Sequence, residues 1–288
     1  MSVQSVFLNG QFVASEDARV SVFDGGWLHG AGLFETMRAE EGRVFRVEAH
    51  IERLRQSAAK LLRPIGREEL PSRVDFLELL ERNQLADARI RLTVSAGNMA
   101  PGAATGASWT VCATAAPLIL PHEKMHQDGA HVALCSYRVS PTDPTGGHKT
   151  TSHFPRLLGL REAQQKQCME ALWFTTRNTL AEGCISNVFV VKDGNLKTPP
   201  PDTPVLPGIA RAVVLELARK MGIAAAETAL SIDDLLDADE VFLTNVVMQV
   251  MPVTKVERRD IADGKVGAVT RRLREAYGEV VRRECAAE

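Results

Sequence analysis

The stretch that decides the fold is Gly146-Gly147-His148-Lys149-Thr150-Thr151-Ser152. Four motifs follow it in order: Glu182-Gly183 with Ser186-Asn187, Leu206-Pro207-Gly208, Thr244-Asn245, and Met251-Pro252-Val253. The order is more informative than any single residue, because it combines one lysine, one carboxylate and turns rich in backbone N–H donors. Such a set suits an aldehyde held by the lysine and an anionic group held by the turns.

Composition limits the classes of protein that this chain can form. It has 288 residues, of which 45% are hydrophobic, and this length predicts two lobes or one large α/β domain. The formal net charge of -2 predicts no nucleic-acid-binding surface. Arginines do gather near the C-terminus, but acidic residues at helical spacing separate them, which indicates a solvated helix face: Arg271, Arg272, Arg274, Arg282 and Arg283.

The sequence also argues against secretory, membrane and metal-binding classes. The chain does not open with a basic segment followed by an apolar one, and no apolar run approaches about 18 residues, so we expect neither a signal peptide nor a spanning helix. Five scattered cysteines are typical of reduced thiols, and we expect a cytoplasmic protein. No CxxC spacing occurs, and we predict no metal site.

The periodicity of apolar residues predicts a smaller α/β domain over residues 1–117. Asn9-Gly10 is typical of a hairpin turn, and Glu41-Gly42 indicates a second hairpin. Apolar residues recur on one helical stripe from Val47 until Pro64 and Gly66 end it. The predicted strands cover residues 3–8, 11–13, 33–38, 44–45, 89–95 and 109–115, and a second helix covers residues 68–83.

A new pattern begins after the prolines at 117 and 121, so we predict a linker over residues 118–125. A larger domain over residues 126–288 would then carry Lys149. Its predicted strands cover residues 132–134, 172–174, 185–191 and 241–243, and its helices cover residues 155–167 and 207–221.

Lys149 is the candidate nucleophile. A cofactor aldehyde needs an amine that is neutral part of the time, and partial burial lowers the pKa of a lysine enough to supply one. The small neighbours Gly146 and Gly147 allow a flat ring to approach. A lysine beside glycines is more often a surface loop residue, so the prediction of pyridoxal 5'-phosphate depends on the motifs that accompany it.

Glu182 is the candidate partner of a protonated ring nitrogen, which makes this cofactor a better electron sink. The helix start at Pro207-Gly208 leaves the backbone N–H groups of Ile209 and Ala210 available for a phosphate. The Arg53 guanidinium can add paired, charge-assisted hydrogen bonds to the same phosphate. Taken singly, each has a structural alternative: a solvated turn glutamate, an ordinary helix start and a surface arginine.

From residue 5 to residue 255 the chain resembles the class IV aminotransferases, the fold-type IV pyridoxal-phosphate enzymes. This family includes branched-chain and D-amino-acid aminotransferases and aminodeoxychorismate lyase. The matching stretches stand in family order: Gly30-Ala31-Gly32-Leu33-Phe34-Glu35-Thr36-Met37-Arg38, His50-Ile51-Glu52-Arg53-Leu54, His148-Lys149-Thr150, Glu182 with Ser186-Asn187-Val188-Phe189, Leu206-Pro207-Gly208-Ile209-Ala210-Arg211, Asp239-Glu240-Val241-Phe242-Leu243-Thr244-Asn245 and Pro252-Val253.

The resemblance implies a two-domain α/β (α+β) fold of the D-amino-acid aminotransferase type, with pyridoxal 5'-phosphate held between the domains. It implies a homodimer that completes each site and a small-molecule amine as substrate. Lys149 would be the Schiff-base lysine and Glu182 the partner of the ring nitrogen. Other cofactor contacts are expected from Arg53, Ser186, Asn187, Ile209, Ala210 and Asn245.

Two departures favour the lyase branch of the family. Position 246 is valine, where aminotransferases usually carry a hydroxyl that meets the phosphate. Thr36 stands where branched-chain transaminases tend to carry glycine and the lyases threonine. We therefore expect a 4-amino-4-deoxychorismate lyase that forms 4-aminobenzoate and pyruvate, with Lys149 and Thr36 as catalytic residues. The alternative is an aminotransferase acting on branched-chain or other amino acids.

Other departures bear on the substrate. Phe154 replaces the tyrosine that bonds the cofactor's phenolic oxygen in branched-chain enzymes, and His153 is the alternative donor. Ala96-Gly97 replaces the Arg-Gly pair of D-amino-acid enzymes, which argues against that branch. Arg91 and Arg138 are the candidate ligands of a substrate carboxylate. Val246 and Phe154 also motivate a third hypothesis, a family member that has lost catalysis and serves as a cofactor-binding or assembly protein. The retained Lys149 and Glu182 argue against it.

Overall fold

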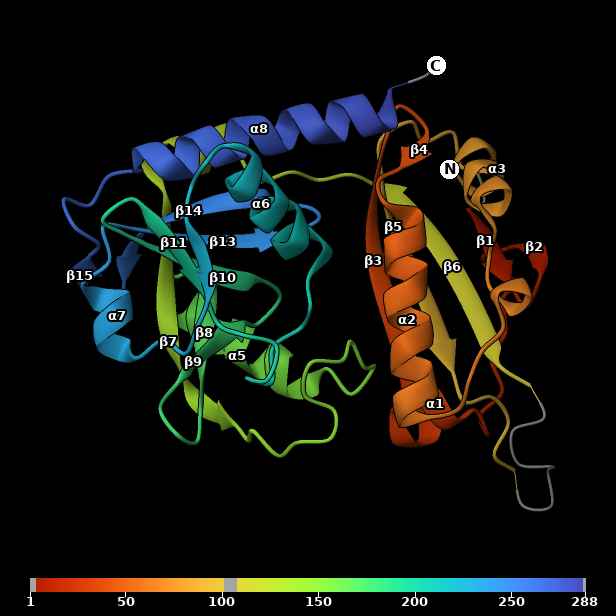
Figure 1. Cartoon of the computed structure of the whole chain (residues 1–288). Coiled ribbons are helices and arrows are strands. Elements are labelled where there is room, and N and C mark those ends of the chain that lie inside the picture. The colour runs from red at the N-terminus through yellow and green to blue at the C-terminus, as the bar shows by residue number, and fades with distance from the viewer. Residues whose placement is uncertain (1–3, 101–107, 287–288) are drawn as a thin grey trace. The chain divides into compact units, whose positions relative to one another are not determined.

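The computed structural model describes residues 4–100 and 108–286, and the chain divides into two compact units. The first unit comprises Met1–Ile119, His148–Ser152 and Val281–Glu288; the second comprises Leu120–Gly147 and His153–Val280. Each unit is built on its own β-sheet with helices beside it (Figure 1). The mixed α/β class predicted from the sequence is confirmed.

The sheet of the first unit has six strands in the order β2-β1-β6-β5-β3-β4, and all neighbours are antiparallel. The turn after β1 has Asn9 and Gly10 at positive φ, 50° and 83°, as a tight hairpin requires. Residue 3 of the predicted first strand lies outside the described residues. The strands are β1 (Ser5–Leu8), β2 (Gln11–Ala14), β3 (Gly32–Glu40), β4 (Arg43–Val44), β5 (Ala88–Ser95) and β6 (Thr110–Pro117).

Helix α2 (Val47–Leu61) packs its apolar stripe onto β3 and β5, as its periodicity predicts. The predicted helix over residues 68–83 is wrong in its first turn, because Pro71 interrupts it. A 3-10 turn (Arg67–Glu69) precedes α3 (Arg73–Arg82), and Ser72 caps α3 in a reciprocal pair of hydrogen bonds with Asp75. The short helix α1 (Gly25–His29) was not predicted.

Strand β3 divides its side chains between the two faces of the sheet. Leu33 and Met37 belong to the core beneath α2. Phe34 and Thr36 point to the opposite face, because side chains alternate along a strand. Their partners in register on β5 are Thr93 and Arg91. One face of this sheet is therefore an apolar core, and the other carries polar side chains.

The second unit has a nine-stranded mixed sheet in the order β12-β11-β10-β13-β14-β7-β8-β9, with β15 paired to β14. Its strands are β7 (Ala130–Val139), β8 (Glu170–Thr175), β9 (Leu180–Gly183), β10 (Asn187–Lys192), β11 (Asn195–Thr198), β12 (Ala225–Glu227), β13 (Glu240–Asn245), β14 (Gln249–Val256) and β15 (Arg259–Asp260). Its helices are α4 (Glu123–Asp128), α5 (Phe154–Gln165), α6 (Ile209–Lys220), α7 (Ile232–Leu236) and most of α8 (Ala268–Cys285).

The lysine segment belongs to the first unit, whereas the sequence predicted it in the C-terminal domain. Its backbone pairs with the edge of β3: Phe34 N–H donates to Lys149 O at 2.9 Å, and Thr151 N–H donates to Gly32 O at 2.9 Å. Thr150 forms an antiparallel bridge with Leu33. The predicted linker over residues 118–125 also differs, because its last three residues begin α4.

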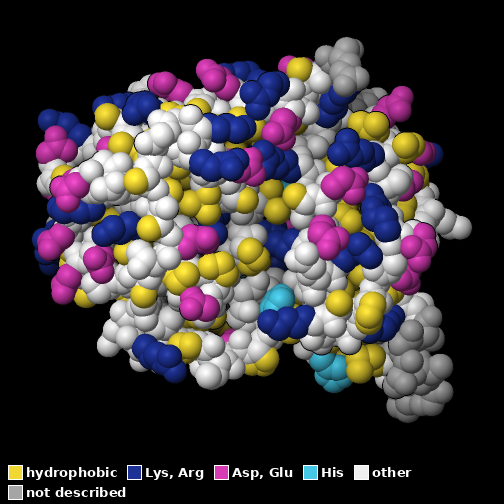
Figure 2. Space-filling model, viewed as in Figure 1, with side chains coloured by type: hydrophobic (Ala, Val, Ile, Leu, Met, Phe, Trp, Pro, Cys, Tyr) yellow, Lys and Arg dark blue, Asp and Glu magenta, His cyan; other side chains and the backbone are white. Residues whose placement is uncertain are grey.

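Acidic and basic side chains are interspersed over the face shown in Figure 2, in keeping with the small net charge. Among the described residues no helix is long and apolar enough to cross a membrane. Within residues 4–100 and 108–286, no three histidine, cysteine or carboxylate side chains gather in a way that could hold a metal ion.

Candidate functional site

Lys149 lies over an aromatic ring of the first unit. Its Nζ is 4.6 Å from the centroid of the Phe34 ring, and the guanidinium carbon of Arg91 is 3.9 Å from the same centroid. The negative face of an aromatic ring attracts cations at such distances. Thr36 stands opposite Arg91 in the strand register. The structure thus gathers three of the predicted residues, Lys149, Thr36 and Arg91, around one face of the sheet.

Two glycines permit the close approach of the lysine segment. Gly30 has φ +65°, and a Cβ atom there would collide with Ser152 Oγ. A Cβ atom on Gly32 would lie 2.9 Å from Thr151 Oγ1, which itself donates a hydrogen bond to Gly30 O at 2.8 Å. Larger residues would push the segment away from β3. This requirement gives the Gly30-Ala31-Gly32 motif a physical reason.

The residue before the lysine is tied to α2. His148 Nδ1 lies 2.8 Å from Ser57 Oγ, and Ser57 is buried. Partial burial lowers the pKa of His148, and the nearby Lys60 charge lowers it further. The Lys149 main chain is therefore held on one side by β3 and, through His148, by α2.

Arg53 is held by a buried carboxylate on the helix-covered face of the sheet. Arg53 Nε donates to Glu35 Oε1 at 2.8 Å and Nη2 donates to Oε2 at 2.5 Å. His50 Nδ1 lies 2.7 Å from Oε2. Burial alone would raise the pKa of Glu35, but the Arg53 charge and the His50 contact outweigh it and lower that pKa to about 2.

His50 is fully buried, and desolvation lowers its pKa despite the opposing effect of Glu35. A neutral imidazole beside a carboxylate carries its proton on Nδ1, so His50 donates to Glu35. Its Nε2 has no hydrogen-bond partner among the described residues. The sequence analysis missed this triad, although a signal existed: Glu35 falls between Leu33 and Met37 on the apolar side of β3.

In the second unit, Glu182 lies near the end of the short strand β9 and is 8% exposed. Its Oε2 accepts hydrogen bonds from Leu206 N–H at 2.9 Å and from Asn187 Nδ2 at 3.3 Å. Its Oε1 accepts from Arg156 Nη2 at 2.7 Å. Donors from three different parts of the chain therefore fix the direction of this carboxylate.

A second buried carboxylate, Glu170, bonds the turn that follows Glu182. Glu170 Oε1 accepts from Ile185 N–H at 2.7 Å and from Ser186 Oγ at 2.9 Å, while its Oε2 has no partner among the described residues. Burial raises the pKa of Glu170 to about 7, since its two hydrogen bonds and the charge of Arg156 only partly oppose it. The predicted cofactor residue Ser186 is thus engaged by Glu170.

The start of α6 has the geometry of an anion-binding helix terminus. Gly208 precedes the first helical residue, and no side chain caps the helix. The N–H groups of Ile209 and Ala210 lack partners within the helix by its geometry. Asn187 Nδ2 donates to Leu206 O at 2.9 Å, and a Cβ atom on Gly208 would collide with Asn187 Oδ1. Asn187 therefore links the Glu182 carboxylate to the start of α6.

Asn245 shapes the turn between β13 and β14. Its Oδ1 accepts from the N–H groups of Val247 and Met248, both at 2.9 Å, and its Nδ2 donates to Ile185 O at 3.3 Å. The preceding Thr244 is buried, and its Oγ1 has no partner among the described residues. The turn is therefore tied to the segment between β9 and β10.

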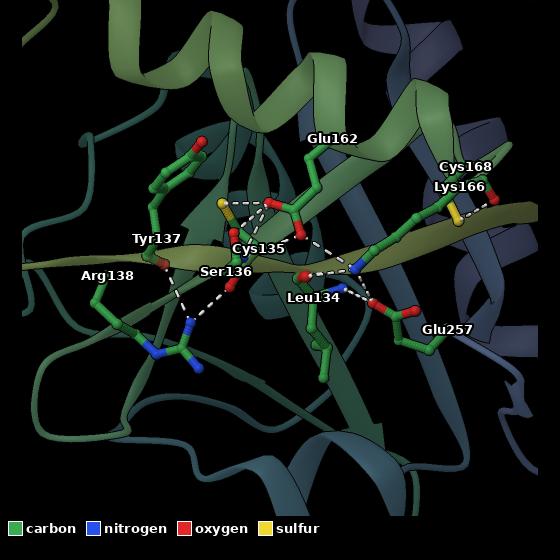
Figure 3. Close-up of polar contacts among 9 residues, drawn as sticks. All are labelled: Leu134, Cys135, Ser136, Tyr137, Arg138, Glu162, Lys166, Cys168 and Glu257. Carbon is green, nitrogen blue, oxygen red and sulfur yellow. Dashed lines mark hydrogen bonds and ion pairs between the residues drawn. The ribbon is translucent and has the colours of Figure 1, made fainter.

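The remaining candidates, Arg138 and His153, lie near the end of β7 and at the start of α5. Arg138 is exposed and donates to the carbonyl oxygens of Cys135 at 2.6 Å and Tyr137 at 3.1 Å (Figure 3). Phe154, the first residue of α5, is 68% exposed, and His153 stands at the helix cap without a capping hydrogen bond. The roles proposed for Arg138 and His153 stay predictions.

Each unit offers groups that fit pyridoxal 5'-phosphate. The uncapped start of α6 suits a phosphate, because its N–H groups and helix dipole favour negative charge. The triply bonded Glu182 suits a protonated ring nitrogen. The first unit supplies an amine, Lys149, whose backbone is fixed, and a guanidinium, Arg53, whose direction is fixed by Glu35.

Known proteins support the same interpretation. Residues 32–256 match the family described as amino-transferase class IV. The chain is 36% identical over 280 residues to a putative branched-chain-amino-acid aminotransferase of Methanocaldococcus jannaschii, covering 96% of each protein. It is 32% identical over 262 residues to the aminodeoxychorismate lyase of Bacillus subtilis, covering 88% of this chain and 86% of that protein.

A similar solved structure is that of a branched-chain amino acid aminotransferase from T.th. with pyridoxamine 5'-phosphate. Its TM-score is 0.90 at 30% identity, covering 99% of this chain and 96% of that one. The chain therefore belongs to the class IV aminotransferase family and is a pyridoxal-5'-phosphate enzyme.

Replacing Glu35 with glutamine should destabilise the protein by about 3 kcal/mol, because it leaves Arg53 without its buried counter-charge. The pKa of Glu35 is lowered in the folded state, so its contribution is present above the ordinary value of 4.5 and is lost as the pH falls toward about 2. Urea unfolding of Glu35→Gln and wild type across this range measures the difference. Glu81→Gln, at an exposed position, is the control. Equal stability of the Glu35 variant and wild type at neutral pH would contradict the assignment.

Glu170→Gln should have the opposite pH dependence. The folded protein keeps the Glu170 proton up to about pH 7, whereas the unfolded chain releases it near the ordinary value of 4.5. Wild type therefore loses up to about 3 kcal/mol as the pH rises through this window, and the variant does not. Denaturation below and above the window measures this, with the exposed Glu275→Gln as control. Parallel pH profiles of Glu170→Gln and wild type would refute it.

Proposed function

We propose that this enzyme is an aminotransferase that moves an amino group from an amino acid to a 2-oxo acid, with branched-chain or related amino acids as substrates. The observation that carries the proposal is the end-to-end similarity to aminotransferases, 36% identity over 96% of each chain in the M. jannaschii protein. The TM-score of 0.90 with the T.th. enzyme adds to it. This proposal replaces the lyase as the first choice, although the lyase stays a candidate.

Lys149 would carry the cofactor and, once a substrate amine has displaced it, would move the proton at the α-carbon. The cofactor, when bound, withdraws electrons from that carbon. Lys149 Nζ suits this work because its backbone is anchored by β3, so the amine pivots about a fixed point. Proton transfer by a positioned amine then needs only side-chain rotation.

The remaining roles follow from the contacts. Glu182, with its three donors, would hold the ring nitrogen in the protonated form. The N–H groups of Ile209 and Ala210, with Arg53, would bind the phosphate. Ser186, Asn187 and Asn245 would support the loops around them, since each bonds a backbone or carboxylate group of that region: Glu170, Leu206 and Ile185.

Arg91 would bind the substrate carboxylate. It is an exposed arginine on the sheet face that also carries Thr36 and Phe34, and its Nε donates to Thr93 Oγ1 at 3.2 Å, which directs the guanidinium toward Phe34. A planar guanidinium fixed in direction suits a carboxylate better than a mobile one. The homodimer and the cytoplasmic location belong to the same proposal and rest on the family resemblance and the cysteine usage.

The lyase is the second candidate, because two features favour it. Thr36 places a hydroxyl group on the sheet face that carries Lys149, and Val246 offers no hydroxyl group in the turn after β13. The 32% identity to the B. subtilis lyase is compatible with it. A lyase would use Lys149 to remove a ring proton of aminodeoxychorismate and Thr36 to assist protonation of the departing enolpyruvyl group.

Mixing the cofactor-loaded enzyme separately with L-leucine, L-glutamate, D-alanine and aminodeoxychorismate distinguishes the two candidates. An aminotransferase should convert the absorbance band of lysine-bound cofactor to that of pyridoxamine phosphate with an amino acid alone, since it stores the amino group. Lys149→Ala should abolish the starting band, and Lys220→Ala, at an exposed site, should keep it. Pyruvate release from aminodeoxychorismate alone, with the band restored and no reaction with the amino acids, would reject the aminotransferase.

Thr36→Val removes one hydroxyl group and keeps the shape of the side chain. For an aminotransferase, we expect less than about a threefold change in the rate of amino transfer, since Lys149 alone moves the proton. For a lyase, pyruvate release should fall by about 100-fold or more, as is usual when a positioned proton donor is lost. Thr114→Val, at the position paired with Arg91 on the same sheet face, is the matched control. A large loss of amino transfer in Thr36→Val alone would contradict the first expectation.

A further inference from the structure

Arg156 is held at three points in the second unit, and the mechanism above gives it no role. Its Nη2 donates to Glu182 Oε1 at 2.7 Å, and its Nη1 donates to Gly183 O at 3.1 Å. The guanidinium carbon lies 4.7 Å from the centroid of the Trp173 ring. Its side chain is 18% exposed, and that of Glu182 is 11% exposed. An arginine fixed in this way has little freedom to turn toward solvent.

The position of Arg156 in the chain makes this arrangement possible. It is the third residue of α5, and Pro155 starts the helix in a favourable conformation. Gly159, one turn later, lies against Trp173 and Cys184, where a Cβ atom would come within 3.1 Å and 2.8 Å of them. The close packing of α5 against β8 brings Arg156 to the carboxylate.

Three donors of the second unit bond the Glu182 carboxylate, and Arg156 is the charged one among them. Glu182 is buried, and the Leu206 N–H and the Asn187 amide, which also donate to it, are uncharged. The Glu170 carboxyl group is close enough that each charge opposes the other. Burial beside a second acid favours protonation of a carboxylate, and a cation bonded directly to it reverses that preference. Arg156 is such a cation.

We propose that Arg156 is a positioning residue that keeps the Glu182 carboxylate ionised and correctly directed, and thereby sets the protonation of the cofactor's ring nitrogen. This inference rests on the proposed role of Glu182. A neutral Glu182 would be a hydrogen-bond donor and could not stabilise a proton on that nitrogen. Trp173 and Gly183 O contribute by holding the guanidinium plane. A lysine at position 156 has the positive charge but no planar guanidinium, so it should not fully keep Glu182 ionised and directed.

The test uses the holoenzyme loaded with pyridoxal 5'-phosphate that carries ¹⁵N at the ring nitrogen. Its NMR resonance distinguishes a protonated from an unprotonated nitrogen. We expect the protonated form in wild type near neutral pH, mainly the unprotonated form in Arg156→Gln, and an intermediate population in Arg156→Lys. The rate of the first half-reaction should fall at least about tenfold in Arg156→Gln, as expected for loss of a hydrogen bond to a charged group. Arg161→Gln, at an exposed position of α5, should match wild type.

A wild-type resonance and rate in Arg156→Gln would overturn the proposal. If that variant does not fold, Arg156→Lys decides, because it keeps the charge that a buried carboxylate needs: a wild-type resonance there overturns the proposal, and a shifted one supports it. The absorbance band of lysine-bound cofactor in wild type tests the proposed function separately from the role of Arg156. Wild type that shows no band of lysine-bound cofactor rejects the proposed function and this inference together, whereas a normal band with an unchanged Arg156→Gln resonance rejects this inference alone.

Discussion

The antiparallel pairing of the lysine segment with the edge of β3 is the constraint on which the first unit depends. A nucleophilic lysine has four rotatable bonds, so its amine is directed only if its main chain does not move. Two backbone hydrogen bonds and the bridge at Thr150 fix that main chain against Gly32, Leu33 and Phe34. Glycine suits positions 30 and 32, because Gly30 has a φ of +65° and a Cβ atom on Gly32 would crowd Thr151 and the Val94 carbonyl oxygen. The direction of the Lys149 amine and the close pairing with β3 therefore depend on the same residues.

Strand β3 shows how one element serves two purposes. Its odd-numbered residues face α2, and among them Glu35 fixes Arg53 and His50 in a buried cluster. Its even-numbered residues face the other way, where Phe34 lies under the Lys149 amine. A one-residue shift in register would exchange these two sets, so the strand pairing that gives stability also secures the chemistry. Burial of Glu35 is tolerated because its charge is matched by a guanidinium that bonds both of its oxygens.

The local patterns of the sequence predicted much of this fold, and the misses have physical causes. The hairpin at Asn9-Gly10 and the stripe of α2 depend on neighbouring residues, so periodicity revealed them. The helix expected over residues 68–83 was wrong where Pro71 interrupts it, a signal that the apolar spacing concealed. Assignment of Lys149 to the first unit depends on pairing with residues more than 100 positions earlier, which no local pattern contains. No sequence pattern indicated a role for Arg156, because an arginine in the first turn of a helix is common and its partners are known only from the structure.

The difference between residues fixed by backbone pairing and residues on the face of the sheet away from the core explains why the chain resembles relatives with different activities. Gly32, Lys149 and Glu182 are tied by backbone hydrogen bonds or strand pairing. In the roles that we propose, they would serve any reaction in which this cofactor withdraws electrons, so an aminotransferase and a lyase would both need them. The residues that we propose to choose the reaction need no such support. Thr36 and Arg91 lie on the sheet face away from the core, where a hydroxyl or a guanidinium can be replaced with little cost to folding. Similarity over the whole chain therefore identifies the family firmly, while the reaction depends on a few side chains that contribute little to that similarity.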